Sequence, residues 1–274
     1  MKQTAQKTIL ITGASSGIGQ ACARHLLAKG WRVYACQRSA PLDADLQAGL
    51  RFVPMDVTDD ASVAQAIAKI LAEAGIIHAA LNNAGFAIAG AIEDTSMEEA
   101  RAQMETNFFG VLRVCRALAP IMRAQGHGHL VTISSLAGVI GLPFSGLYSA
   151  SKFALEGLCE SLRFELRPFG VRVALIEPGD FDTALPANRR RAAAAGPNSA
   201  YSARFEASQK AQAADEAKAP KPLMVARVLE RILAQRRPKL RHVVGAAGQT
   251  IVVPLKRLLP QAWFEAVLRA ATGA

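Results

Sequence analysis

A tyrosine and a lysine stand four residues apart at Tyr148 and Lys152, in a segment with helical periodicity. Residues at this spacing lie on one face of an α-helix, so the lysine ammonium is expected beside the tyrosine phenol. A nearby cation lowers the phenol pKa from its reference value of about 10, which would let Tyr148 exchange a proton with a carbonyl oxygen. Such pairs also occur on ordinary solvated helix faces, so the rest of the chain must decide between the two roles.

A glycine-rich loop near the start of the chain has the spacing of a dinucleotide-binding site. The apolar run Thr8–Thr12 predicts a strand, and an Ala- and Leu-rich helix follows as far as Gly30. Between them, the first glycine permits a tight turn, the second lets a pyrophosphate approach the backbone, and the third lets the helix pack on the strand. The helix N-terminus then faces the phosphates. The loop residues predicted to bind the cofactor are Gly13, Ser15, Ser16, Gly17, Ile18 and Gly19.

The end of the second predicted strand indicates which dinucleotide binds. This strand, Trp31–Cys36, is followed by Gln37 and Arg38. NAD-binding units usually carry a carboxylate here for the ribose diol. A neutral residue followed by a guanidinium suits a 2′-phosphate instead, so the sequence predicts NADP(H).

Polar and small residues also follow the third and fourth predicted strands, Arg51–Met55 and Ile76–Leu81. Asp56, next to Val57, either contacts the adenine amine or caps the following helix, predicted from residue 59 to 73 with a start near Thr58; the two roles are compatible. After the fourth strand, small residues let the backbone approach a ligand, and the amides are suited to bond a ribose and the adjoining strand. These residues are Asn82, Asn83, Ala84 and Gly85.

Asn107 lies in the middle of a long helix predicted from Met97 to Met122. Asparagine prefers caps and turns, and a mid-helix asparagine is often only an exposed substitution. The flanking Phe108 and Phe109 favour a buried position, where the amide would need hydrogen-bond partners. A buried, functional amide is therefore weighed against an exposed one.

The remaining pattern completes a regular alternation of strands and helices. A fifth strand, His129–Ile133, leads into Ser135; the helix of Tyr148 continues to Arg167; and a sixth strand, Val171–Ile176, precedes Pro178 and Gly179. A helix over 223–235 and a strand over 240–244 follow. This alternation predicts an α/β fold with a single doubly wound parallel sheet of Rossmann type, helices on both faces, and ligands at the carboxyl ends of the strands. The whole chain, 1–274, is expected to be one domain.

Two segments fall outside this alternation. Residues 180–222 are Ala- and Arg-rich, without a clear apolar period, and are too long for a plain connection, so they are predicted to form a substrate lid. Residues 248–274 form an apolar C-terminal extension interrupted by Pro254 and Pro260. Basic residues beside its apolar ones are compatible with contact to a membrane surface, although core packing or a subunit contact explains them equally well.

Composition limits the class of protein. The chain has 274 residues, 51% of them hydrophobic, and no apolar run near its N-terminus long enough for a secretory signal or a membrane span, which predicts a cytoplasmic location. Its four cysteines are scattered singly, which favours buried, reduced thiols over metal ligands. The net charge of +10 suggests anionic partners, but the basic clusters lack interleaved aromatic residues, so nucleic acid is not expected as a partner.

Together, these motifs resemble the short-chain dehydrogenase/reductase family over residues 8–183. The segment 141–162 is further similar to 17β-hydroxysteroid dehydrogenase type 1 and the retinol dehydrogenases, which implies a lipophilic alcohol or ketone as substrate. The resemblance implies that Tyr148 is the proton donor or acceptor, that Lys152 lowers its pKa and bonds the nicotinamide ribose, and that Ser135 orients the substrate oxygen. Asn107 would hold a water that links Lys152 to solvent.

By the same resemblance, Asn83 meets the adenosine ribose, Asp56 and Val57 flank adenine, and Thr183 reaches the carboxamide. The predicted cofactor set is completed by Arg38, Ala84, Gly85, Tyr148, Lys152, Pro178 and Gly179. The predicted substrate-binding residues are Ser135, Leu142, Phe144, Tyr148, Phe181 and Leu185, and the resemblance requires no metal.

The sequence thus predicts an NADP(H)-dependent oxidoreductase that interconverts a lipophilic ketone or aldehyde and its alcohol. The alternatives are a catalytically silent NADP-binding sensor and a 3-oxoacyl reductase of the same family. A homodimer is expected, because relatives pair through the helices that carry Asn107 and Tyr148. The extension after Val244 disfavours a tetramer, because it could cover the edge strand that would pair.

Overall fold

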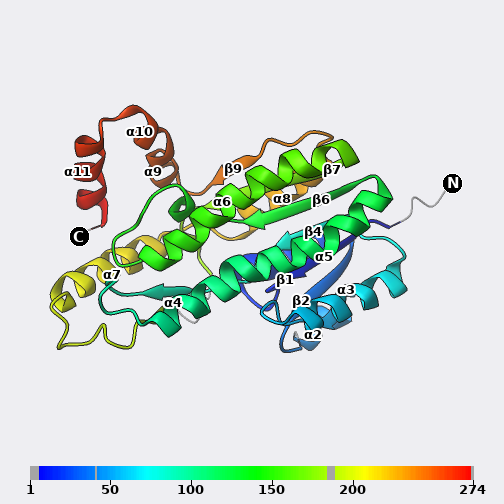
Figure 1. Ribbon diagram of the computed structural model, residues 1–274, viewed down its shortest axis with the longest axis horizontal. Helices are drawn as coiled ribbons and strands as arrows, with labels where there is room; N and C mark the ends of the chain where they lie inside the picture. Colours follow the sequence, from blue (N-terminus) through cyan, green and yellow to red (C-terminus); the bar gives the residue numbers. More distant parts are fainter. Residues whose placement is uncertain (1–5, 41, 184–188, 273–274) are drawn as a thin grey trace.

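The strands assemble into a seven-stranded sheet in which every pairing is parallel (Figure 1). The computed structural model describes residues 6–40, 42–183 and 189–272. The order reverses between β1 and β4, which creates the crevice typical of doubly wound sheets and confirms the predicted fold. In sheet order, the strands are β3 (Arg51–Pro54), β2 (Arg32–Gln37), β1 (Thr8–Thr12), β4 (Ala79–Asn82), β6 (Gly128–Ile133), β7 (Val171–Pro178) and β9 (Arg241–Val244).

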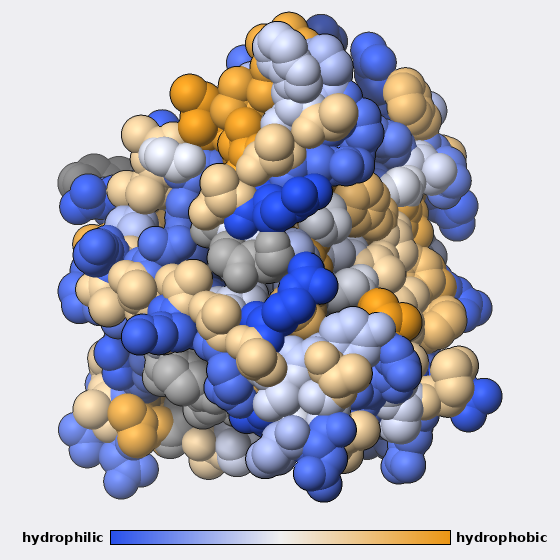
Figure 2. All heavy atoms as spheres, turned by 90° about the vertical axis from the view of Figure 1, so that its left-hand side faces the viewer, coloured by the Kyte–Doolittle hydropathy of each residue, from blue (hydrophilic) through white to orange (hydrophobic). Residues whose placement is uncertain are grey.

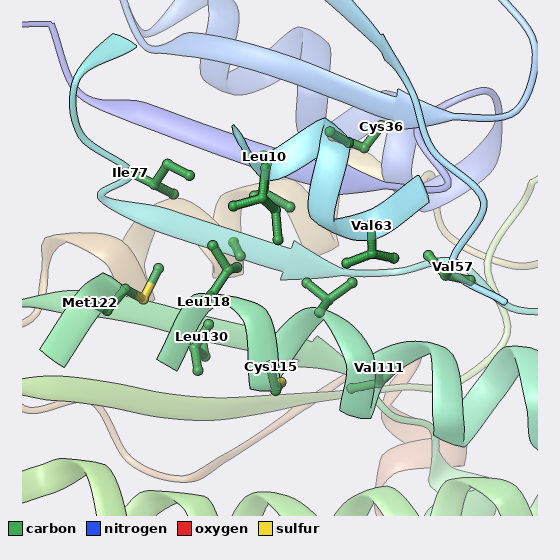
Figure 3. Close-up of a cluster of buried hydrophobic side chains, with 14 of the residues drawn as sticks. Leu10, Cys36, Val57, Val63, Ile77, Val111, Cys115, Leu118, Met122 and Leu130 are labelled. Carbon is green, nitrogen blue, oxygen red and sulfur yellow. The ribbon is translucent and has the colours of Figure 1, made fainter. Parts of the chain in front are cut away.

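Helices cover both faces of the sheet. One face packs against α1 (Gly17–Ala28) and α8 (Leu223–Ala234), and the other against α3 (Asp60–Ala74), α5 (Gly110–Gln125) and α6 (Gly146–Leu166). Figure 3 shows part of the core between the sheet and helices α3, α5 and α6. Leu10 of the sheet and Leu118 of α5 are both fully buried there. The strands are apolar on both sides because both sides are covered. The short α2 (Asp43–Gln47) follows β2.

The long helix expected over residues 97–122 is three consecutive segments. After α4 (Met97–Met104), a π-helical turn over Glu105–Phe109 leads into α5. A π-turn inserts an extra residue into the helical ladder, often at a functional site, and here it contains Asn107. At α3, the cap expected near Thr58 is Asp59, whose carboxylate accepts hydrogen bonds from the first-turn amides.

Residues 189–216 are more ordered than their composition suggests. The strand β8 (Arg189–Arg191) pairs in parallel with β5 (Ala87–Ala89), and α7 (Ser202–Glu216) follows. A small apolar cluster holds these pieces together and includes Ile88, Ala89, Ala192, Ala195 and Phe205. Few residues of α7 are buried, which explains why no helical period is visible in the sequence.

The C-terminal extension forms three short helices: α9 (Ala247–Thr250), α10 (Val252–Leu258) and α11 (Gln261–Thr272). Pro254 lies in the first turn of α10 and Pro260 just before α11, where proline is tolerated. These helices stand at the end of the sheet where the strands have their carboxyl ends, beside α7 (Figure 1). Among the described residues, no helix is long and apolar enough to cross a membrane.

Candidate active site

The predicted catalytic residues converge at the carboxyl end of the central strands. Tyr148 and Lys152 lie in the first two turns of α6, Ser135 follows β6, and Asn107 lies in the π-turn between α4 and α5. The helix begins at Gly146. Four side chains from three separate parts of the sequence are thus brought to one edge of the sheet.

Lys152 is buried, and its ammonium donates a hydrogen bond to the carbonyl oxygen of Ile133 at 2.8 Å. The Nζ atom also lies 5.6 Å from the centroid of the Tyr148 ring. Burial lowers the pKa of Lys152 to about 8, against the opposing charge of Glu156. The pair predicted from the four-residue spacing therefore exists, with the ammonium held at the end of β6.

The pKa of Tyr148 is raised rather than lowered in this structure. Burial is the largest cause, because it penalises the phenolate, and the neighbouring Ser135 side chain opposes it. The lowering expected from Lys152 does not prevail, since that ammonium is directed at the Ile133 carbonyl. Tyr148 is consequently protonated in this structure, which is the form that a proton donor to a ketone needs.

Ser135 connects the ends of two neighbouring strands. Its hydroxyl accepts a hydrogen bond from the Ala137 amide at 3.1 Å and donates one to the Pro178 carbonyl at 3.5 Å. The first bond caps a short 3₁₀ turn over Leu136–Gly138. Its orientation is therefore set by backbone groups of both β6 and β7, close to Tyr148.

Asn107 is buried, and both the oxygen and the nitrogen of its side-chain amide have hydrogen-bond partners. Of the two positions considered from the sequence, buried or exposed, the buried one is correct. Its amide exchanges hydrogen bonds with the backbone of Phe86, at 3.0 Å to the N–H and 2.9 Å to the carbonyl, and donates to Ser151 Oγ at 3.1 Å. It therefore ties the loop after β4 to α6. The water contact implied by the family resemblance stays a prediction.

Sequence reasoning missed Gln103, one turn before Asn107 on the same side of the helix. The Gln103 side chain is fully buried, accepts from the Ile88 amide at 2.8 Å and donates to the Phe86 carbonyl. It positions the same loop as Asn107. The four-residue spacing of two buried amide side chains is the signal that would have found it.

The glycine loop adopts the conformation that its sequence predicts. Gly13 and Gly17 have positive φ angles of 63° and 54°, which favour glycine. A Cβ on Gly13 would come within 2.8 Å of the Ala84 backbone, so this turn also needs glycine for space. Asn83 ties the two loops together by donating from its amide to the carbonyls of Thr12 and Gly13, at 3.1 and 2.9 Å.

The adenosine end of the crevice fits a dinucleotide without a ribose-binding carboxylate. Gln37 is buried, and its Oε1 atom has no hydrogen-bond partner among the described residues, although its amide nitrogen donates to the Ser39 carbonyl at 2.8 Å. Arg38 is exposed beside it and forms no ion pair with a residue that the structure describes. An orphaned acceptor and an unpaired cation at the end of β2 suit a ribose that carries an anionic group.

Asp56 holds the turn before α3. Its Oδ1 atom accepts from the Thr58 amide and hydroxyl at 2.9 and 2.7 Å. Burial would raise the pKa of this carboxyl, but the bonds from Thr58 and the charge of Arg38 lower it overall. Asp56 is thus ionised near Arg38, and it supports the α3 turn without being the helix cap. Val57 beside it is buried.

Two grooves lie along this end of the molecule, the face shown in Figure 2. One, of about 580 Å³, is bounded by Ser16, Gly17 and Thr183, with the start of α8 opposite. Thr183 lies against the glycine loop, and its Oγ1 atom has no hydrogen-bond partner among the described residues. The other groove, of about 390 Å³, lies between Phe144, the α7 segment and α11.

The predicted substrate residues are only partly brought together. Phe144 has a φ of 56°, unusual for a non-glycine residue, and its ring meets Phe205 edge-on at 5.6 Å. Leu142, half-buried in the same loop, donates its amide to Ser149 Oγ at 3.2 Å. Phe181, however, is 1% exposed and packs in the core beneath α8, so its assignment to the substrate wall is corrected. Leu185 lies outside the described residues.

Comparison with known proteins agrees with this geometry. Residues 7–194 match the family model described as short chain dehydrogenase. A 3-ketodihydrosphingosine reductase of Bacteroides thetaiotaomicron is 39% identical over 95% of this chain and 96% of that protein. The crystal structure of a short-chain dehydrogenase from Streptomyces avermitilis superimposes over all of both chains with a TM-score of 0.84 and 30% identity.

A short-chain dehydrogenase/reductase from Burkholderia phymatum, solved in complex with NAD, has a TM-score of 0.76 and 28% identity over 88% of this chain and 90% of that one. The chain therefore belongs to the short-chain dehydrogenase family. It is an oxidoreductase that acts on CH–OH groups and the corresponding carbonyls.

Proposed function

We propose that the protein is an NADPH-dependent reductase of a ketone carried on a long apolar chain. The observation that carries the proposal is the convergence of Tyr148, Lys152 and Ser135 at the end of β6. The groove at Phe144 is linked to them by the loop that leads into α6. The 39% identical relative is named for a lipid ketone, which favours a long-chain substrate over a steroid or retinoid.

In this mechanism, the chain's own groups bind the carbonyl and supply its proton. A bound nicotinamide would supply the hydride for the carbonyl carbon. The hydroxyls of Ser135 and Tyr148 stabilise the charge that develops on the substrate oxygen, and Tyr148 then gives up its proton there. Lys152, whose ammonium is fixed by the Ile133 carbonyl, supports the charge on the phenol oxygen after proton transfer.

The preference for NADP(H) is assigned to Arg38. Its exposed guanidinium suits a 2′-phosphate, and the neutral Gln37 offers no carboxylate for a ribose diol. Arg38→Asp should therefore weaken the binding of NADPH and strengthen the binding of NADH. The ratio of kcat/KM values for the two cofactors is the measurement, and an unchanged ratio would remove Arg38 from the proposal.

The substrate class is tested by following NADPH absorbance against a matched panel of ketones. The panel includes a long-chain 3-keto amine, a 3-oxoacyl thioester, a steroid ketone, retinal and a short aromatic ketone. The long-chain 3-keto amine should give the highest kcat/KM. Turnover confined to the thioester would favour the 3-oxoacyl reductase, and tight NADPH binding without turnover of any ketone would favour a silent sensor.

A further inference from the structure

The outward face of α11 is apolar. Its exposed apolar residues recur at the spacing of a single helix face: Ala262, Trp263, Ala266, Val267 and Ala270. Trp263 is 68% exposed. A different side of the helix carries Phe264, which is only 3% exposed. A surface helix normally turns its polar side outward, so a second apolar face marks a contact surface.

The preceding helix extends this surface. Ile251, just before α10, and Leu258, at its last position, are 54% and 79% exposed. Both lie on the outer side with Pro254, which is also exposed. In Figure 2, hydrophobic side chains gather in the upper part of the face, where the C-terminal helices lie. We call this surface, made by α10 and α11, the C-terminal apolar surface.

The charges around the C-terminal apolar surface select its partner. Residues 251–272 contain three basic side chains, Lys256, Arg257 and Arg269, and one acidic side chain, Glu265. Arg257 and Arg269 are exposed, in a chain of net charge +10. Apolar side chains flanked by exposed cations are complementary to a bilayer with anionic headgroups. Pairing with a second copy would instead bring like charges together.

The same helix borders the groove at Phe144. Its side chains Glu265, Leu268 and Arg269 line the 390 Å³ groove, opposite Phe144. Phe144 belongs to the loop that leads directly into α6, which carries Tyr148. One helix therefore carries the outward apolar residues and also borders the groove at Phe144.

We propose that α10 and α11 dock on the surface of an anionic lipid bilayer, so that the groove at Phe144 opens toward the lipid. An amphiphilic ketone then reaches the groove without leaving an apolar environment. This delivery step rests on the proposed function, whereas the docking itself does not.

Flotation with vesicles of phosphatidylcholine, with and without phosphatidylglycerol, tests the docking on the full chain. The chain has two tryptophans, so Trp31→Phe leaves Trp263 as the only reporter. The protein should float with the anionic vesicles, and the Trp263 emission should shift to shorter wavelength as the ring enters the interface. Absence of both effects overturns the proposal.

Matched variants locate the contact. Leu258→Ser should reduce the partition coefficient, whereas Leu42→Ser, at a site 63% exposed beside α2, should leave it unchanged. Arg257→Gln should reduce the partition coefficient about fivefold, which corresponds to ~1 kcal/mol per cation near an anionic surface. Arg237→Gln, at a position that is also exposed, should leave it unchanged. Equal effects of test and control variants would contradict docking through this surface.

Two further measurements separate the remaining outcomes. If Leu258→Ser changes the mass measured by light scattering and the wild type ignores vesicles, the surface is a subunit contact and the proposal is wrong. If the protein binds anionic vesicles but reduces no ketone, docking stands and the proposed function fails. If docking delivers substrate, anionic vesicles should raise kcat/KM for a long-chain ketone and leave that for a short soluble ketone unchanged.

Discussion

Tyr148 is the residue whose replacement tests the proposed chemistry most directly. Tyr148→Phe removes the proton donor and keeps the ring, so turnover of any ketone substrate should fall ~10²–10⁴-fold while NADPH affinity changes little. Stopped-flow turnover and fluorescence titration of NADPH measure the two quantities. Wild-type turnover in the variant would exclude Tyr148 as the acid.

Lys152→Met is the companion variant, with a different expected signature. The ammonium is placed to serve both the phenol and, by family resemblance, the nicotinamide ribose, so turnover and cofactor affinity should both fall. A loss of turnover with unchanged cofactor affinity would remove the ribose contact from the scheme.

Ionisation of Glu177 lowers the stability of the folded protein, so this stability depends on pH. This carboxyl is 1% exposed at the end of β7, and burial together with the nearby Glu156 raises its pKa to about 7 from an ordinary 4.5, against the charge of Arg241. The folded state thus binds more protons than the unfolded state within this interval. The free energy of unfolding of the wild type therefore decreases as the pH rises from 4.5 to about 7, by roughly 3 kcal/mol at most.

Glu177→Gln should remove this dependence. The variant should gain stability relative to wild type between about pH 5 and about pH 8, as measured by denaturant unfolding. Glu160→Gln is the control, because Glu160 shares Arg241 but is half-exposed, at 51% of its side chain. If the difference in free energy of unfolding between Glu177→Gln and the wild type is constant across this range, the pKa of Glu177 is not raised in the folded state.

At the scale of elements, the sequence predicted the strands and helices whose apolar residues recur regularly. The seven strands, the glycine turn and the Tyr148 helix follow from apolar runs and glycine spacing. The π-turn at Asn107 was not visible, because it depends on a buried amide finding the Phe86 backbone 21 residues away. Phe181 was misplaced because an apolar residue after a strand is equally suited to a pocket wall or to the core.

The C-terminal extension shows the same limit. Gln249 accepts a hydrogen bond from the Asp180 amide at 2.9 Å and donates one to its carboxylate at 2.7 Å. These bonds connect α9 to the loop that follows Pro178 and Gly179. Nothing local in either segment indicates the pairing, since it joins residues 69 positions apart.

The segment 180–222 remains a predicted lid, now with a defined attachment. Phe205 of α7 is buried against Phe144, and Arg189 pairs with Glu216. Phe205→Ala should detach α7 at a local cost of ~3 kcal/mol and speed tryptic cleavage between Arg189 and Lys218. In the wild type, NADPH with a long-chain ketone should slow cleavage more than NADPH alone. Equal rates in all states would make the segment a passive insertion.

At the scale of the whole molecule, the assembly depends on which surfaces stay exposed. The C-terminal extension was expected to cover the sheet edge at β9 and so to disfavour a tetramer. Its contacts instead lie at the carboxyl end of the sheet, where Lys256 donates to the Val139 carbonyl and Gln249 clamps Asp180. Val243 on β9 stays 40% exposed, so protection of this edge rests on its four-residue length rather than on a cover.

The homodimer expected from family resemblance would use the helices that carry Asn107 and Tyr148. Three large aromatic side chains are exposed there: Phe109 in the π-turn at 42%, and Phe153 and Phe164 on α6 at 42% and 74%. Phe164→Glu would place a charge in such an isologous contact against its own symmetry mate, which should convert a dimer to a monomer. Light scattering at several concentrations measures the mass, with Leu42→Glu as the control for an added surface charge. A wild-type tetramer would show that β9 pairs between subunits despite its short length, and a dimer unaffected by Phe164→Glu would move the interface elsewhere.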